Sequence, residues 1–241
     1  MMKYINLVLF TGMIVMNYLA NAIPLNNKTT GELSDSFPNL FVPAGITFSI
    51  WGIIYLLLLI YSIVQFTGSN QIAISKISLV FGISCMLNAL WIVTWHYGKL
   101  PLSLIVMAGM LISLIYINMA IEHLPFGIIK AAFGIYLGWI CIATIANVTA
   151  LLVSYNWIGF GLSQEAWTIV MIAIGALIVA VTIYRISNPF IGLSVIWAFT
   201  GIIIKRQEDY KSIVIAAAVA IAVVSVVTLW GFFRKGTVVA G

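Results

Sequence analysis

Long apolar runs, separated by short polar segments, extend over almost the whole 241-residue chain. A helix needs about 20 mostly apolar residues to cross the hydrocarbon core of a bilayer. Eight runs have approximately this length, and their apolar positions are continuous, which excludes the alternating pattern of a membrane β-barrel. The runs are Tyr4–Ala22, Ala44–Phe66, Ile77–Trp95, Leu102–Ile121, Ile128–Val153, Ala166–Ile183, Phe190–Ile204 and Ile213–Phe233. The pattern predicts an all-α integral membrane protein with about eight spanning helices.

Two of these runs leave alternatives open. The seventh is short, and the polar stretch 185–189 before it ends in a helix-breaking proline, so a pair of half-helices is the alternative there. The first run follows a basic start and ends on Ala20-Asn21-Ala22, which has the form of a signal-peptide cleavage site. We favour a first transmembrane helix over a cleaved signal peptide.

The connections between the runs indicate which loop could cover a functional site as a lid and how the chain is oriented in the membrane. Only one inter-helix loop is long, the polar segment from Ile23 to Val42, and loops of this length usually cover a functional site or are disordered. With eight spans, the terminal side of the membrane carries six Lys and Arg residues against five on the opposite side. Because cytoplasmic loops are enriched in these residues, the count favours both termini in the cytoplasm.

Composition supports the membrane assignment and removes several function classes. Hydrophobic residues make up 63% of the chain and charged residues 7%, against roughly 45–50% and 25% in soluble domains. Charged residues fall in loops or at helix ends, whereas proton-coupled pumps need ionisable groups inside the membrane. The net charge of +5 forms no basic face, so we expect no nucleic-acid partner. His96 and His123 lie at helix ends, and Cys85 and Cys141 lack metal-ligand spacing, so we expect no metal site and no disulfide framework.

Three of the runs carry stripes of aromatic and amide residues at helical spacing. The stripes are Phe48, Trp51 and Tyr55 in the second run, Asn88, Trp91 and Trp95 in the third, and Tyr136, Trp139, Ala143 and Asn147 in the fifth. An asparagine in hydrocarbon needs a hydrogen-bond partner, so Asn88 and Asn147 should face the bundle interior together with their stripes. From spacing alone these ten residues either pack against one another, the commoner outcome for aromatic stripes, or line a site for a flat, largely apolar ligand.

These stripes resemble the signatures of the TspO/translocator protein family, the tryptophan-rich sensory proteins. Residues Pro43–Tyr55 are similar to its second-helix pattern Pro-Pro-x-Trp-x-Phe-x-x-Trp-x-x-x-Tyr, and Leu87–Trp91 to its third-helix Leu-Asn-x-x-Trp. Residues Tyr136–Asn147 are similar to its fifth-helix Tyr-x-x-Trp-x-x-x-Ala-x-x-x-Asn. The order of the motifs and the long first loop agree as well. The resemblance covers about residues 4–156.

The chain also departs from the pattern of that family. Ala44 and Ile46 stand where a proline and a tryptophan are usual, Ile135 replaces a proline, and Trp95-His96 replaces the usual aromatic pair. The last three runs have no counterpart in the five-helix family. We therefore expect a divergent relative with a five-helix domain over residues 1–156 and accessory transmembrane helices over residues 157–241.

The resemblance implies a function that the spacing alone does not. It implies binding of porphyrins and other tetrapyrroles, sterols or similar flat hydrophobes, with Trp51 and Trp139 as cavity walls and the first loop as the lid. It also implies homodimers in a bacterial cell membrane. Light-dependent porphyrin breakdown is an enzymatic activity that the resemblance alone suggests. We expect a multi-pass membrane receptor or sensor without catalytic residues or a certain cofactor. A small-molecule facilitator or exporter, or a structural subunit without a ligand, is the alternative.

Overall fold

The structure is a computed structural model that describes residues 1–23, 25–67 and 70–234. Within these residues it is helical and contains no strand. The elements are α1 (Met2–Ala22), η1 (Leu25–Asn27), α2 (Thr30–Asp35), η2 (Gly45–Ser49), α3 (Ile50–Val64), α4 (Gln71–His96), α5 (Leu100–Ala120), α6 (Ile128–Ser154), η3 (Gly159–Gly161), α7 (Gln164–Ile186), α8 (Phe190–Arg206) and α9 (Lys211–Phe233). The fold is the all-helical membrane bundle that the apolar runs predict.

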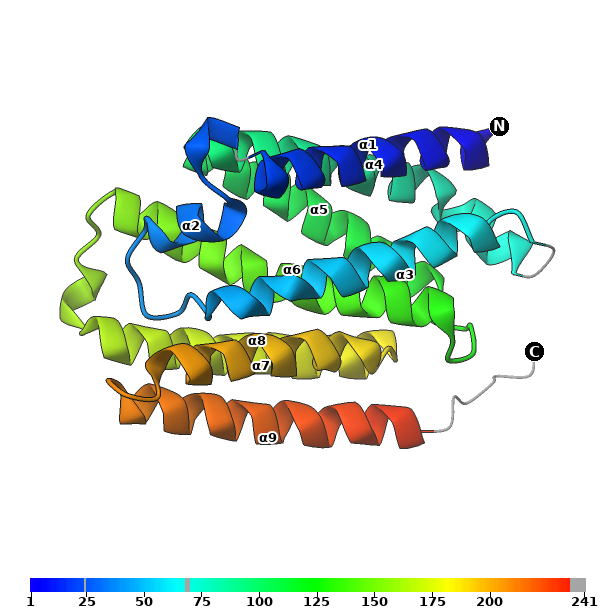
Figure 1. Cartoon of the computed structure of the whole chain (residues 1–241). Helices are drawn as coiled ribbons and strands as arrows, with labels where there is room; N and C mark the ends of the chain where they lie inside the picture. The colour runs from blue at the N-terminus through cyan, green and yellow to red at the C-terminus, as the bar shows by residue number, and fades with distance from the viewer. Residues whose placement is uncertain (24, 68–69, 235–241) are drawn as a thin grey trace.

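The eight long helices run up and down through one bundle (Figure 1). Helices α1, α4 and α5 lie on one side, α7, α8 and α9 on the other, and α3 and α6 between them. Helix α1 begins and α9 ends at the same end of the bundle. The long first loop and the connections α4–α5, α6–α7 and α8–α9 lie at the opposite end, which we call the lid end.

Each of the eight predicted runs corresponds to one long helix, with ends shifted by a few residues. Among the described residues, seven segments are long and apolar enough to cross a membrane, and α8, with 17 residues, is shorter. Helix α8 is nevertheless one continuous helix between α7 and α9, so the half-helix alternative does not apply. The break before it is sharp because Ser187 takes a left-handed conformation (φ 53°) and Pro189 caps the next helix.

Helix α1 is an integral part of the bundle. The Asn6 side chain donates to the backbone oxygen and hydroxyl of Ser78 on α4, both at 2.9 Å. Further along α1, Asn17 Nδ2 donates to Asn88 Oδ1 on α4 at 2.7 Å. Buried amide pairs of this kind join helices inside a bilayer, where water is absent. These contacts join α1 to α4 as a helix of the bundle.

The C-terminal helices pack directly on the centre of the bundle through α6 and α8. Gly138 on α6 lies so close to α8 that an added Cβ would overlap the carbonyl oxygen of Ile191 and the hydroxyl of Ser194. Asn188, in the α7–α8 connection, adds a bond to α5: its Nδ2 donates to Asn118 Oδ1 at 2.8 Å. The boundary predicted at residue 156 falls in the α6–α7 connection, and a separable C-terminal unit stays a prediction.

Candidate functional site

Helices α3, α4 and α6, together with η2 and the first loop, bring five aromatic side chains around one cavity of about 40 Å³. The Trp139 ring meets Trp51 edge-to-face at 6.2 Å between ring centres and meets Phe48 edge-to-face at 5.9 Å. On α4, Trp91 and Trp95 are one helical turn apart and stack at 5.7 Å. We call this space the tryptophan cavity. Its lining residues are Thr30, Ser34, Pro43, Phe48, Trp51, Trp91, Trp95, Trp139, Ile142, Ala143, Ala146 and Asn147.

A second cavity, of about 120 Å³, adjoins the first on the side of α1. Thr30, Phe48 and Trp51 line both cavities, and Asn17, Asn21, Gly31, Tyr55 and Ile92 complete the second one. The ring of Tyr55 stacks on Trp51 at 5.4 Å. Both spaces are smaller than the roughly 300 Å³ at which pockets for drug-sized ligands begin. In this position of the first loop, neither space is large enough for a drug-sized molecule.

The ten residues that the stripes predict fall into three groups, according to which cavity, if any, they line. Seven of them line the tryptophan cavity and Tyr55 lines its neighbour. Asn88 and Tyr136 are not among the lining residues of either cavity. Their polar atoms bond to one another instead: Asn88 Nδ2 donates to the Tyr136 hydroxyl at 2.9 Å, and that hydroxyl donates to Met110 Sδ at 3.0 Å. Together with the bond from Asn17, this cluster fixes α1, α4, α5 and α6 behind the site.

The sequence stripes miss five lining residues of the tryptophan cavity. Ile142 and Ala146 lie on the same face of α6 as Trp139, and helical spacing alone would have found them. Thr30 and Ser34 come from the first loop, and no local pattern points to them. Pro43 directly follows that loop and is the first residue of the second-helix signature. The resemblance does imply a lid over the cavity, and Thr30 and Ser34 are its contact with the site.

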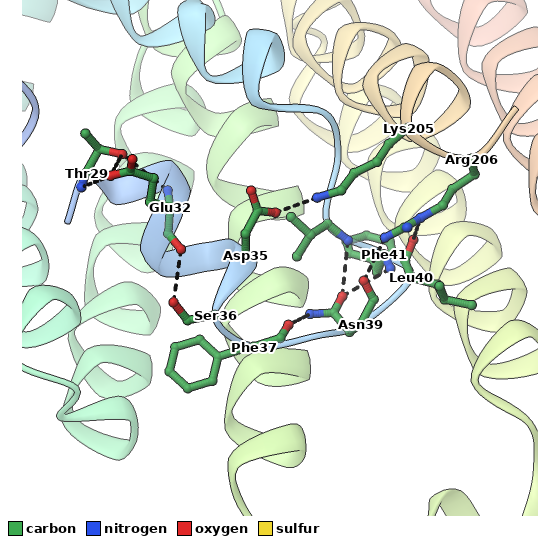
Figure 2. A network of polar contacts seen from close by, with 11 residues as sticks. Thr29, Glu32, Asp35, Ser36, Phe37, Asn39, Leu40, Phe41, Lys205 and Arg206 are labelled. Atoms are coloured by element: carbon green, nitrogen blue, oxygen red, sulfur yellow. Dashed lines mark hydrogen bonds and ion pairs between the residues drawn. The ribbon is translucent and has the colours of Figure 1, made fainter. Parts of the chain in front are cut away.

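The lid contains a short helix with a complete N-terminal cap. Thr29 Oγ1 accepts from the backbone nitrogen of Glu32, and the Glu32 carboxylate accepts from the backbone nitrogen of Thr29, so both form a capping box (Figure 2). These hydrogen bonds, with a smaller contribution from Lys28, lower the pKa of Glu32 below its ordinary value. The cap explains why this polar loop has a defined conformation.

The lid is tied to the end of α4 by His96. This residue lies at a helix end, as expected, but its side chain is buried rather than interfacial. His96 Nδ1 lies 3.1 Å from the carbonyl oxygen of Leu25, and Nε2 lies 3.1 Å from the hydroxyl of Thr30. Because a carbonyl only accepts, Nδ1 carries a proton, and the Thr30 hydroxyl is the partner of Nε2. The imidazole thus joins the helix that carries Trp91 and Trp95 to a lid residue of the cavity.

The lid is tied on its other side to the end of α8. Arg206 donates from Nη2 to the carbonyl oxygen of Asn39 at 2.8 Å and from Nε to that of Leu40 at 3.1 Å (Figure 2). Lys205 forms an ion pair with Asp35 at 2.5 Å. Deeper in the bundle, Trp197 Nε1 donates to the carbonyl oxygen of Thr47 at 2.9 Å. We call these contacts the lid clamp; it shows that α8, although absent from the cavity walls, holds the loop that closes the cavity.

A wider cavity of about 270 Å³ lies at the lid end between the first loop, the end of α6 and the start of α7. The Trp157 and Trp167 rings on its wall lie 4.9 Å apart, and Trp167 Nε1 donates to the carbonyl oxygen of Gly159 at 2.6 Å. Nothing in the sequence spacing of these two tryptophans predicts a shared cavity. The lid residues Pro38, Asn39, Leu40 and Phe41 also line this cavity.

Comparisons with known proteins place the chain in a family. No curated protein and no solved structure matches it. A family model described as "TSPO-like protein" does match, over residues 3–230, which run from α1 through most of α9. The match therefore continues through the C-terminal helices instead of stopping at the five-helix part. Together with the all-helical membrane bundle and the three aromatic stripes, it shows that this chain belongs to the TSPO-like protein family.

Proposed function

We propose that the protein is a membrane receptor that binds a flat, largely apolar small molecule in the tryptophan cavity. The observation that carries the proposal is the convergence of Trp51, Trp91, Trp95 and Trp139 from three helices, and of Phe48 from η2, on one small cavity. Aromatic faces and edges bind planar apolar molecules well, because such rings prefer stacked or edge-to-face contacts. The lid and its clamp would keep the bound molecule from water and from lipid.

The resemblance to the translocator protein family suggests tetrapyrroles and sterols as ligand classes. The volumes of the two adjoining cavities, about 40 and 120 Å³, limit the size of a molecule that can enter without movement of the lid. A porphyrin is larger than either, so it would enter only after the lid has moved outward. A small planar molecule also exceeds the space of about 40 Å³ but needs a smaller movement than a porphyrin, so small planar molecules are the first ligands to test.

The direct test is calorimetric titration of the detergent-purified full-length protein with fluorene, a compact planar hydrocarbon. We expect saturable binding with one site per chain, and release of the ligand when a competing planar compound is added. Absence of saturable heat, together with a mass spectrum in which no small molecule co-purifies, would contradict the receptor function. It would favour a structural membrane subunit.

Releasing the lid clamp should widen the range of ligands. Arg206→Ala removes the two hydrogen bonds to the lid carbonyls of Asn39 and Leu40. We expect protoporphyrin IX to quench tryptophan fluorescence severalfold faster in this variant than in the wild type, while fluorene affinity changes less than threefold. Arg185→Ala, an exposed charge where α7 ends, at the end of the bundle away from the lid, is the matched control. Equal quenching rates in all three proteins would show that the clamp does not limit entry.

A facilitator is the second candidate function. The first loop lines both the tryptophan cavity and the wider cavity at the lid end, so one movement of the loop would affect both spaces. A facilitator should speed the uptake of protoporphyrin IX into liposomes that contain trapped serum albumin. A receptor should bind the same compound without changing the uptake rate.

A further inference from the structure

The wider cavity at the lid end is a space of its own. Its walls come from the first loop, the end of α6, η3 and the start of α7, so two of its four walls lie outside the five-helix part of the chain. None of its described lining residues lines the tryptophan cavity or the cavity beside it. Its volume of about 270 Å³ has room for about nine groups of the size of a water molecule.

Hydrogen bonds hold two facing walls of this cavity in place. On one side Trp167 Nε1 donates to the carbonyl oxygen of Gly159, which takes a left-handed conformation (φ 66°) and brings the η3 turn over the indole. On the other side Asn39 Oδ1 accepts from the backbone nitrogens of Phe41 and Val42, both at 3.1 Å. The cavity is therefore preformed, as binding sites for small molecules usually are.

The walls are mostly apolar and carry no charge. Among the described residues that line the cavity, none is acidic or basic. The indole N–H of Trp157 and the side-chain amide of Gln164 lie on the wall and have no hydrogen-bond partner among the described residues. A carboxylate or phosphate without a cation is disfavoured in such a place. A neutral molecule with an apolar body and a hydrogen-bond acceptor at one end matches these walls.

The rim of the cavity indicates where such a molecule comes from. Ile158 is 85% exposed and Phe160 is 83% exposed, and Tyr155 and Leu162 are exposed beside them. Large apolar side chains gathered in this way mark contact with another apolar phase. They follow the end of α6, a helix long enough to cross a membrane, at the level where tryptophans favour the membrane interface. The rim therefore faces lipid.

We propose that the wider cavity binds a neutral acyl ester that enters from the membrane interface. The acyl chain lies between the rings of Trp157 and Trp167 and the lid residues 38–41, and the ester carbonyl accepts from Trp157 Nε1. The occupied cavity supports the lid from the outside, because the same turn of the lid is held by Arg206 through the carbonyls of Asn39 and Leu40. This site is independent of any ligand in the tryptophan cavity.

The test offers three amphiphiles with twelve-carbon chains in equal amounts to the full-length protein in nanodiscs of ether-linked phospholipid, which has no ester carbonyl. They are 1-monolaurin, its ether analogue 1-O-dodecylglycerol, and laurate at a pH of about 9, where its carboxyl group is ionised. Native mass spectrometry distinguishes the three by mass. We expect one monolaurin to be retained per chain, about fivefold more than the ether, the size of one hydrogen bond, and at least tenfold more than laurate.

Two variants and a control locate the site. Leu152→Trp fills the cavity from the end of α6 and should reduce retained monolaurin at least fivefold, whereas Val181→Trp, on the exposed face of α7, should keep it. Trp157→Phe keeps a ring but removes the N–H, and should lower the preference for the ester over the ether to less than twofold. This second variant changes little volume, so it tests the site even if Leu152→Trp does not fold.

A second readout follows the lid. Bound monolaurin should slow hydrogen exchange at the backbone amides of Phe41 and Val42 in the wild type and leave it unchanged in Leu152→Trp. Equal retention of the three amphiphiles, or full retention of monolaurin by a folded Leu152→Trp protein, would overturn the proposal. The mass of the ester retained on protein taken directly from cell membranes distinguishes a two-chain membrane lipid from a free single-chain ester. None of these measurements depends on fluorene binding, so the receptor function and this site can fail separately.

Discussion

Gly138→Ala is expected to lower the stability of the protein more than any other single methyl addition in the central helices. An added Cβ would overlap the carbonyl oxygen of Ile191 and the hydroxyl of Ser194 on α8, and backbone atoms cannot move away as a flexible side chain does. Overpacking of this kind costs about 1–3 kcal/mol, and more when backbone is displaced. Thermal unfolding in detergent, followed by circular dichroism, should show a clearly lower midpoint.

Gly52→Ala is the matched control for that experiment. Gly52 lies on an exposed face of α3, and a Cβ placed there meets no atom within 4 Å. Since alanine is a better helix former by about 0.5–1 kcal/mol, this variant should be unchanged or slightly more stable. A Gly138→Ala protein as stable as the wild type would contradict the close α6–α8 contact. It would favour the C-terminal helices as a loosely attached layer.

Trp139→Ala should cause the largest loss of ligand binding. Trp139 is 4% exposed and lies between Phe48 and Trp51, so its removal takes away two edge-to-face contacts and one wall of the cavity. A well-placed aromatic pair contributes about 0.5–1.5 kcal/mol beyond its buried area, and lost area costs roughly 25 cal/mol per Å². We expect fluorene to bind on the order of ten- to a hundredfold more weakly by calorimetry.

Two further variants separate lost binding from lost folding. Trp139→Phe keeps a ring between Phe48 and Trp51 and should recover most of the fluorene affinity. Trp230→Ala removes a tryptophan that is 43% exposed at the far end of α9 and should leave binding nearly unchanged. If all three variants bind fluorene like the wild type, the aromatic stripes serve only packing.

The sequence by itself determined the membrane class, the number of long helices and the faces that carry the aromatic residues. A helix in a bilayer must hydrogen-bond its own backbone polar groups and present apolar side chains to lipid. Its length and apolar character can therefore be read from one continuous apolar run in the sequence. Spacing along a helix likewise determines which residues share a face, which is why the stripes alone single out Trp51, Trp91 and Trp139. The family match over residues 3–230 agrees with the stripes.

Only the tertiary structure decided which polar groups meet. Asn88 and Asn147 have similar positions in their stripes, yet their hydrogen bonding differs. The Asn88 side chain is hydrogen-bonded to Asn17 and Tyr136, whereas Asn147 Oδ1 has no partner among the described residues. The lid clamp joins Asn39 to Arg206, which are 167 positions apart, and no local pattern encodes such a pairing. Cavity size is also a tertiary property, because it depends on how closely rings from three helices and the lid approach one another. These contacts arise from the packing of helices against each other, and a single helical period carries no information about them.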